Sequence, residues 1–168
     1  MRIFLIGFMG SGKSHWGKLL ASRLQLPHFD LDQVIEADQE MSVTQIFEQK
    51  GEEKFRLLEK QQLEKLIETH PGLVLSTGGG TPCFFNNIEL MKTKGIVVWL
   101  NPSIDTLLTR LLQEKEKRPL IKNIPEKELR AFLLKKMNDR RLYYEQAAVQ
   151  INEDQVTLDE CLQLILHA

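Results

Sequence analysis

Short apolar runs recur along the chain, and stretches with helical spacing separate them. The runs 2–6 and 96–100 are apolar at almost every position. A strand that is buried on both faces has this composition, because helices cover both sides of a parallel sheet. The stretches 28–32, 73–75 and 149–151 predict three further strands. Since strands alternate with helices, we expect an α/β fold with a parallel sheet and right-handed crossovers.

The segments between the strands predict helices through their periodicity and their end signals. Ser42 and Thr157 are each followed three residues later by Gln or Glu, which is the capping-box pattern. Asn101-Pro102 has the favoured order of a cap residue and a first-turn proline. Residues 113–125 are highly charged and contain two prolines, so we expect a mobile surface loop there. Helices are expected over residues 13–24, 43–51, 52–68, 85–94, 102–112 and 126–146, and after Thr157.

Residues 7–14 read Gly-Phe-Met-Gly-Ser-Gly-Lys-Ser, between the first strand and the first helix. This is the G-x-x-x-x-G-K-S pattern of a phosphate-binding loop in the context that it requires. Glycines let backbone amides approach an anion, and the N-terminus of the following helix adds a positive dipole end. Lys13 would reach the β- and γ-phosphates, and Ser14 would hold Mg²⁺. The pattern therefore predicts a binding site for a nucleoside triphosphate.

Composition narrows the function classes. At 168 residues the chain has the length of one compact domain. The net charge of −1 leaves no basic field for nucleic acid. No apolar run has the length of a membrane helix or the form of a secretory signal. Cys83 and Cys161 lack metal-ligand spacing, so we expect reduced thiols in the cytoplasm. A monomer with no nucleic-acid or membrane partner is the default expectation.

Two acidic residues, Asp30 and Asp32, follow the second strand. One carboxylate near the phosphates could order Mg²⁺ through its waters, and the other could accept a proton from a hydroxyl nucleophile. Helix capping is the alternative, because Asp is common where a helix starts. Two acids at a strand end, one crossover from a nucleotide loop, favour the functional interpretation.

Two arginines are expected to point toward the body of the protein. Arg56 continues an apolar helical stripe, with Glu52 and Glu59 at positions that can pair with it. Its spacing supports an exposed salt bridge and a binding role equally well. Arg140 lies on the apolar face of its helix, whereas Arg141 turns away. An arginine on that face either extends along the surface or offers its planar fork to a carboxylate in a cleft.

Three consecutive glycines, Gly78, Gly79 and Gly80, exceed what a simple turn requires. Close approach of the backbone to a ligand explains them better. Arg118, in the charged loop, is either an ordinary solvated charge or an arginine that a closing loop brings to a transferring phosphate.

Taken together, these motifs resemble the shikimate kinase family over nearly the whole chain. The resemblance implies a three-layer α/β/α fold whose five-stranded parallel sheet has the order 2-3-1-4-5. It also implies a substrate-binding region at about 31–62, a lid at about 112–125, and Mg²⁺-dependent transfer of phosphate from ATP to the 3-hydroxyl of shikimate, toward chorismate and the aromatic amino acids. The matching motifs are Gly7–Ser14, Asp30-Leu-Asp32, Phe55-Arg56 with Glu59, Ser76–Gly80, Arg118-Pro-Leu120, and Arg140 with Tyr144.

The resemblance also implies roles for individual residues. Lys13, Asp32 and Arg118 would be catalytic, with Asp32 as the base. Ser14 and Asp30 would serve the metal. His15 stands where family members usually have Ser or Thr, with little expected loss. The residues assigned to ATP are Gly10, Ser11, Gly12, Lys13, Ser14, His15, Arg110 and Arg118. Those assigned to shikimate are Asp32, Phe47, Phe55, Arg56, Gly78, Gly79, Gly80 and Arg140.

Two alternatives remain open from the sequence. A gluconate kinase of the same fold also binds a polyhydroxy acid, although the triple glycine and the Phe-Arg pair favour shikimate. A nucleotide-binding regulatory protein without catalysis is the second. The intact Lys13, Ser14, Asp30 and Asp32 argue against it, because a switch could dispense with the acid pair.

Overall fold

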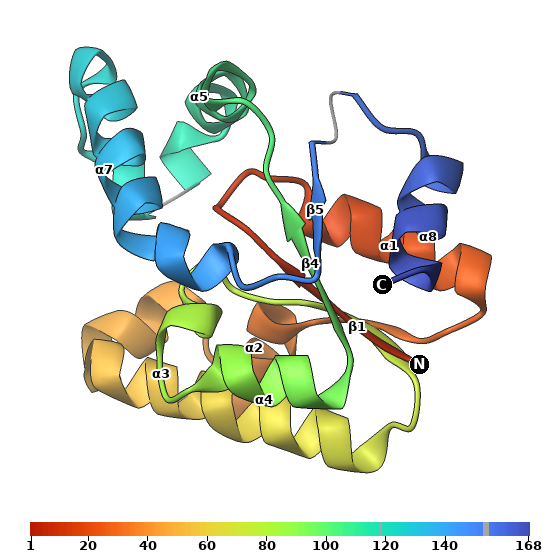
Figure 1. Ribbon diagram of the computed structural model, residues 1–168. Coiled ribbons are helices and arrows are strands. Elements are labelled where there is room, and N and C mark those ends of the chain that lie inside the picture. Colours follow the sequence, from red (N-terminus) through yellow and green to blue (C-terminus); the bar gives the residue numbers. More distant parts are fainter. Residues whose placement is uncertain (118, 153–154) are drawn as a thin grey trace.

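The computed structural model describes residues 1–117, 119–152 and 155–168. Their five strands form one parallel sheet in the order β2-β3-β1-β4-β5, which confirms the predicted topology (Figure 1). The carboxyl ends of β1 and its neighbours therefore meet at one edge of the sheet, where ligands of such folds bind. The strands are β1 (Arg2–Ile6), β2 (His28–Asp30), β3 (Leu73–Ser76), β4 (Ile96–Leu100) and β5 (Val149–Ile151).

Helices cover both faces of the sheet. In Figure 1, α3 and α4 lie below the sheet, and α1 and α8 lie on its other side. The helices are α1 (Lys13–Leu24), α2 (Leu31–Gln39), α3 (Val43–Thr69), α4 (Asn87–Lys94), α5 (Ile104–Gln113), α6 (Pro119–Lys122), α7 (Glu126–Tyr144) and α8 (Leu158–Leu166), with short 3-10 turns at Thr81–Cys83 and Lys115–Lys117.

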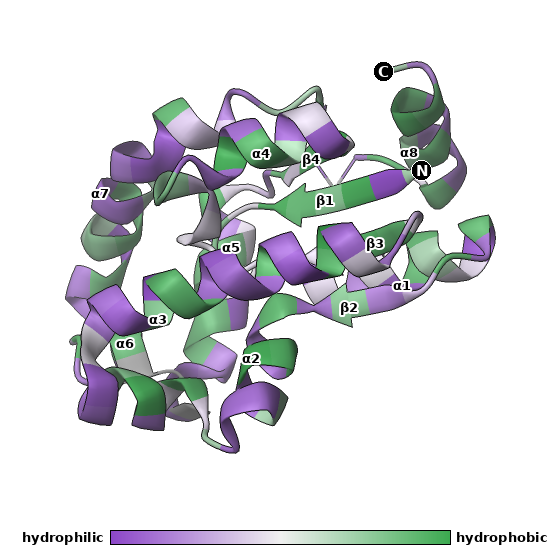
Figure 2. Cartoon of the chain, turned by 90° about the horizontal axis from the view of Figure 1, so that it is seen from below, coloured by the Kyte–Doolittle hydropathy of each residue, from purple (hydrophilic) through white to green (hydrophobic). Residues whose placement is uncertain are grey.

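Alternate side chains of β1 enter two separate cores. Phe4 and Ile6 pack in the cluster shared with α3 and α4, whereas Ile3 and Leu5 pack in the cluster shared with α1 and α8. This alternation follows from the two-residue repeat of a strand, and it explains why the whole run is apolar. In Figure 2, β1 is green along most of its length, whereas α3 carries both purple and green positions.

Most predicted boundaries agree with the structure. The capping boxes at Ser42 and Thr157 are both present. Helix α3 is interrupted at Gly51, whose φ of 82° and ψ of 166° are not helical, so the predicted stop is confirmed. The predicted cap at Asn101-Pro102 is wrong: Ser103 caps α5 by accepting from the amide of Thr106.

Two further expectations need correction. Strand β2 ends at Asp30, and Asp32 lies in the first turn of α2 instead of in the strand. Residues 113–125 contain regular structure, namely the 3-10 turn Lys115–Lys117 and α6. Ile121 of α6 is fully buried in a third core cluster, against Phe8 and residues of α5 and α7. The high charge of this segment gave no indication in the sequence that Ile121 is buried.

In the described part of the chain no helix has the length and hydrophobicity to span a membrane.

Candidate functional site

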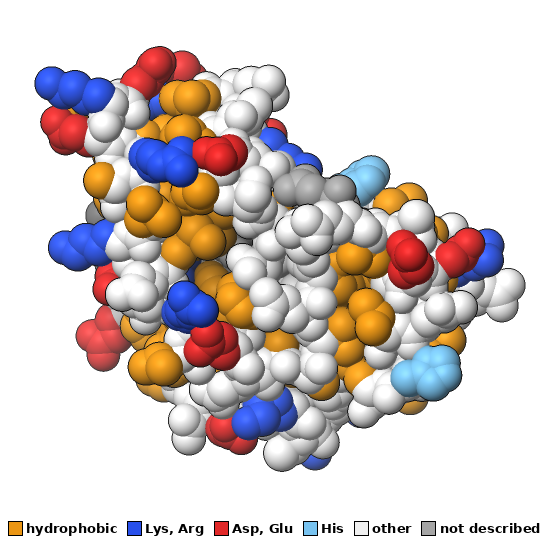
Figure 3. All heavy atoms as spheres, turned by 45° about the horizontal axis from the view of Figure 1, so that its top comes forward, with side chains coloured by type: hydrophobic (Ala, Val, Ile, Leu, Met, Phe, Trp, Pro, Cys, Tyr) orange, Lys and Arg blue, Asp and Glu red, His pale blue; other side chains and the backbone are white. Residues whose placement is uncertain are grey.

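A cleft of about 550 Å³ opens at the carboxyl ends of β1, β2 and β3. It brings together residues that lie more than a hundred positions apart in the sequence, as the predicted topology requires. Lys and Arg alternate with Asp and Glu on the face in Figure 3, so any selectivity for an anion must be local. The predicted residues in its wall are Gly10, Gly12, Lys13, Ser14, His15, Asp30, Asp32, Gly78, Gly79 and Arg110; Met9, Thr77, Gln113 and Glu114 join them.

The loop 7–14 has the conformation expected of a phosphate cradle. Gly7, Gly10 and Gly12 have φ values of 141°, 76° and 85°, which L-residues rarely adopt. A Cβ on Gly7 would lie 2.5 Å from the carbonyl oxygen of Leu100, so the loop is also closed to larger residues. No described side chain caps the N-terminus of α1. The positive end of this helix dipole lies at the wall of the cleft, where it favours an anion.

Lys13 and a network behind it fix the start of α1. Lys13 Nζ donates to the carbonyl oxygens of Gly7 and Phe8, both at 2.8 Å. The Ser76 hydroxyl donates to the Lys13 carbonyl at 2.9 Å, and His28 Nε2 lies 3.0 Å from the same hydroxyl. The Lys13 side chain bonds to the loop itself, and the Ser76 and His28 contacts fix the start of α1 to β3 and β2. Ser11, which was predicted to bind ATP, is fully buried within the loop and is not among the residues that line the cleft.

Asp30 caps a helix, as the alternative interpretation predicted, and it also contacts the phosphate loop, whereas the catalytic role of the acid pair stays a prediction. Asp30 caps α2 by accepting from the amide of Asp32 at 3.2 Å, and its other oxygen accepts from the Ser14 hydroxyl at 2.6 Å. The cap therefore aims Asp30 at the phosphate loop. Ser14 and Asp30, the predicted metal residues, are in direct contact.

Asp32 holds a buried carboxylate oxygen with no hydrogen-bond partner among the described residues, Oδ1. Burial raises the pKa of Asp32 to about 7, and the charges of Asp30 and Glu59 add to that rise, while Lys13 opposes it. A carboxylate with this pKa can accept a proton near neutral pH. A substrate hydroxyl could donate a hydrogen bond to Oδ1 and so give this oxygen the partner that it lacks among the described residues.

Arg56 forms a buried ion pair, so the exposed salt bridge that its spacing allowed is wrong, and its binding role stays a prediction. Its Nη1 donates to Glu59 at 2.7 Å, and Glu59 is fully buried and also accepts from the Thr81 hydroxyl. Nε and Nη2 both donate to Glu52 Oε1, at 3.2 and 3.1 Å. Burial alone would lower the pKa of Arg56, but Glu59 and Glu52 together raise it. Arg56 therefore stays charged inside the protein.

Aromatic rings surround the same guanidinium. Its central carbon lies 4.5 Å from the ring centre of Phe84, 5.4 Å from that of Phe55 and 5.9 Å from that of Phe47. Phe47 and Phe55 contact each other at 4.6 Å between centroids. Phe47 and Phe55 were predicted for this site; Phe84 was not, since an exposed aromatic after a 3-10 turn carries no local signal.

The triplet 78–80 is packed against charged side chains at every position. None of the three glycines has a positive φ, so the backbone conformation does not demand glycine. Limited space favours glycine here, because side chains of the protein lie where a Cβ would stand. The predicted close approach of the triplet to a ligand stays a prediction. The nearest side-chain atoms to an added Cβ are Glu59 Oε1 at 2.6 Å for the first position, Arg140 Nη1 at 3.1 Å for the second and Arg56 Nη1 at 2.6 Å for the third.

Arg140 turns inward, as its helical face predicted. Its guanidinium lies 5.4 Å from the ring centre of Phe8 and beside Gly79. Tyr144, one turn later, donates its hydroxyl to the Gly79 carbonyl at 2.6 Å and packs against Trp99. Burial raises the pKa of Tyr144, so the phenol stays protonated and keeps donating. The sequence analysis names Tyr144 only as part of the motif with Arg140, and it did not predict this contact.

The predicted residues thus form two adjoining groups. One lines the cleft around the phosphate loop, and the other is built around Arg56 and Arg140. They meet at Gly78, where an added Cβ would lie 2.6 Å from Glu59 and 3.2 Å from Asp32.

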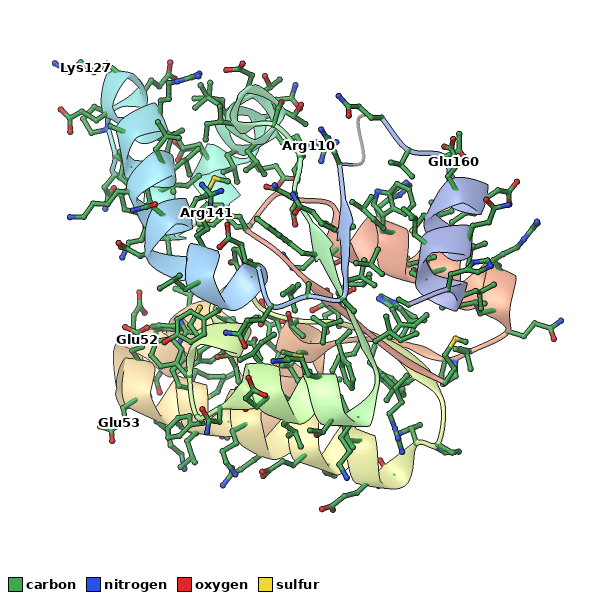
Figure 4. All side chains as sticks on the ribbon, viewed as in Figure 1. Glu52, Glu53, Arg110, Lys127, Arg141 and Glu160 are labelled. Carbon is green, nitrogen blue, oxygen red and sulfur yellow. The ribbon has the colours of Figure 1, made fainter. Side chains whose placement is uncertain are left out.

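Two arginines were predicted for the nucleotide. Arg110 lines the cleft and donates to the Gly10 carbonyl at 3.2 Å (Figure 4). Arg118 lies outside the described residues.

Burial raises the pKa of Cys83 to about 11, so its thiol is protonated at neutral pH. We therefore assign Cys83 a structural role.

Comparison with known proteins decides the family. The shikimate kinase family model matches residues 9–168. The chain belongs to the shikimate kinase family. A shikimate kinase from Azobacteroides pseudotrichonymphae is 41% identical over 165 residues, which cover 98% of this chain and 97% of that protein.

Solved shikimate kinases also share the fold. The crystal structure of the shikimate kinase from Bacteroides thetaiotaomicron matches with a TM-score of 0.88 at 36% identity, covering 99% of this chain and 95% of that one. A shikimate kinase from Acinetobacter baumannii, solved in complex with shikimate, matches with a TM-score of 0.85 at 35% identity, covering 99% and 93%.

Proposed function

We propose that the protein transfers the γ-phosphoryl group of ATP to the 3-hydroxyl of shikimate and so forms shikimate 3-phosphate. The observation that carries the proposal is the position of Asp32. Its unpartnered oxygen lies between the phosphate loop, which supplies a donor site, and the Arg56 group, which supplies an anion-binding acceptor site. Family membership supports the same acceptor, because relatives carry this activity in their names.

The donor half holds the triphosphate. The amides of the loop and the N-terminus of α1 face the cleft, and Lys13 adds a positive charge within it. Phosphoryl transfer depends mainly on positioning and charge stabilisation, so these groups supply much of what the reaction needs. Arg110 would pack near the adenine, and Arg118 would reach the phosphates from a lid at about 112–125.

Mg²⁺ fits the pair of Ser14 and Asp30. Their oxygens are 2.6 Å apart at the cleft wall, and hydroxyl and carboxylate oxygens are ligands that Mg²⁺ accepts. Among the described residues no three His, Cys, Asp or Glu side chains form a metal cage. Mg²⁺ in kinases needs none, since phosphates and waters complete its shell. When bound, the ion would neutralise charge on the transferring phosphoryl group.

The acceptor half holds a small hydroxylated acid. Arg56 and Arg140 would bind the shikimate carboxylate, with Phe47 and Phe55 on the apolar side of the ring. Asp32 would bind the reacting hydroxyl through Oδ1 and accept its proton as phosphate is transferred. The substrate-binding region would extend over about 31–62. We also propose that the protein acts as a monomer in the cytoplasm.

An acceptor panel tests the proposal. Purified protein with MgATP should release ADP in a coupled assay when shikimate is added, and not with gluconate or a nucleoside monophosphate. Turnover with gluconate alone would favour the rival kinase. Nucleotide binding without turnover on any acceptor would favour the regulatory alternative.

A further inference from the structure

We propose that Glu52 acts as an internal substitute for the substrate carboxylate, and that it must release Arg56 before shikimate can bind. Glu52 would thereby set the affinity for the acceptor without taking part in the reaction. The proposal rests on the role of Arg56 given above.

The contacts of Arg56 show which of its edges a ligand can use. A guanidinium has five N–H donors in a planar fork. Glu59 takes a donor of Nη1, and Glu52 takes Nε and Nη2, the paired donors of one edge. Phe84 and the backbone of Gly80 lie close to the guanidinium, so a ligand can approach it only along its edges. The edge of Nε and Nη2 has the paired geometry that carboxylates prefer, and a carboxylate already occupies it.

The two glutamates differ in how firmly they are held. The side chain of Glu59 is 0% exposed and is also bonded to Thr81, whereas that of Glu52 is 59% exposed. Within the described part of the chain, Arg56 is the single partner of the Glu52 side chain. Glu52 directly follows Gly51, where the helix is interrupted and an added Cβ would meet nothing within 4 Å. Glu52 is therefore the partner that can leave.

The charges around Arg56 favour replacement of the Glu52 carboxylate by that of the substrate over binding of a third carboxylate beside the two glutamates. Glu52 and Glu59 already place two carboxylates on one guanidinium, and a third would be repelled by both. If the substrate carboxylate replaces that of Glu52, the number of negative charges on Arg56 does not change. Glu52 then returns to water, where its exposed position makes solvation complete.

Glu53 offers a matched control. It is the next residue, it is exposed, and it makes no side-chain hydrogen bond or ion pair with any described residue. Figure 4 shows the side chains of Glu52 and Glu53 leaving α3 on different sides. Glu53→Gln therefore removes the same charge at the same helix turn without touching Arg56.

The experiment compares Glu52→Gln and Glu52→Ala with Glu53→Gln and Glu53→Ala. We expect both Glu52 variants to lower the KM for shikimate by roughly two- to fivefold, the range of an exposed ion pair. Their KM for ATP and their kcat should stay unchanged, as should all constants of the Glu53 variants. Calorimetric titration with shikimate should give the same fold-change in Kd.

The Arg56→Ala variant distinguishes two failures. One is that Glu52 does not compete with the substrate, and the other is that Arg56 does not bind the substrate at all. An unchanged KM for shikimate in Arg56→Ala would refute the role of Arg56 itself. If Arg56→Ala raises that KM while the Glu52 variants raise it or leave it unchanged, competition by Glu52 is overturned. A raised KM would make Glu52 a positioning residue for the guanidinium.

Discussion

The Tyr144 hydroxyl donates to the carbonyl oxygen of Gly79 at 2.6 Å, across 65 residues of sequence. This bond joins the last turn of α7 to the glycine triplet. Arg140 lies one turn earlier on the same helix, next to Gly79. The position of a proposed substrate-binding arginine therefore depends on a tyrosine that need not touch substrate.

Tyr144→Phe should raise the KM for shikimate while changing kcat and the KM for ATP little. The variant keeps the packing on Trp99 but leaves the Gly79 carbonyl without its donor, at a cost of about 1–3 kcal/mol. Steady-state kinetics checks this, with Tyr143→Phe as the control, because Tyr143 is an exposed neighbour. Equal kinetics in both variants would show that the bond does not position the acceptor site.

Arg140→Ala should raise the KM for shikimate by about tenfold or more, the usual loss for a hydrogen bond to a charged group. The affinity for ATP should remain nearly intact, because Arg140 is not among the residues that line the nucleotide cleft. The control is Arg141→Ala, since the exposed Arg141 pairs with Glu145 at 2.6 Å. An equal loss for both substrates would mean that Arg140 is wrongly assigned.

Asp32→Asn should lower kcat on the order of 10²- to 10⁴-fold, because the amide cannot accept the proton. In the unmodified protein, burial first and then Asp30 and Glu59 raise the pKa of Asp32 to about 7. The base works when deprotonated, so kcat/KM for shikimate should rise with pH through about 7 and then level off. A rate that is flat across that range would remove Asp32 as the base.

The same carboxyl should make the free protein less stable at alkaline pH. Its pKa is higher in the folded chain than in the unfolded chain, so folding favours the protonated form and stability is lost as pH rises through about 7. Asp32→Asn should therefore raise the free energy of unfolding at about pH 8, by on the order of 1–4 kcal/mol. Denaturant titrations should show this gain shrinking below pH 7 and vanishing below about pH 4. A constant gain at every pH would have another cause.

Local sequence signals predicted the conformation of the phosphate loop and its place at the cleft well. The phosphate loop and its glycines are contiguous, and their context of strand and helix is local too. The sheet order came from the family resemblance, because strand periodicity alone does not fix it. The helix-capping interpretation of Asp30 is confirmed, and the same residue contacts Ser14 of the loop, whereas its role toward Mg²⁺ stays a prediction.

The surroundings of Arg56 could not be predicted from the sequence, because contacts between distant segments of the chain form them. The burial of Arg56 follows from Thr81, Gly80 and Phe84, which lie more than twenty residues further along the chain. Helical spacing could indicate its partners Glu52 and Glu59 but not its environment. In the same way, charge concealed the buried Ile121 within residues 113–125.

We propose that one carboxylate, that of Asp32, directs phosphate from ATP to a single hydroxyl of shikimate. The most direct test is phosphorus and proton NMR of the product formed from MgATP and shikimate. We expect a single phosphate ester on the 3-hydroxyl, which the unmodified protein forms and which Asp32→Asn forms far more slowly. An ester on another hydroxyl, or equal product from both proteins, would contradict it.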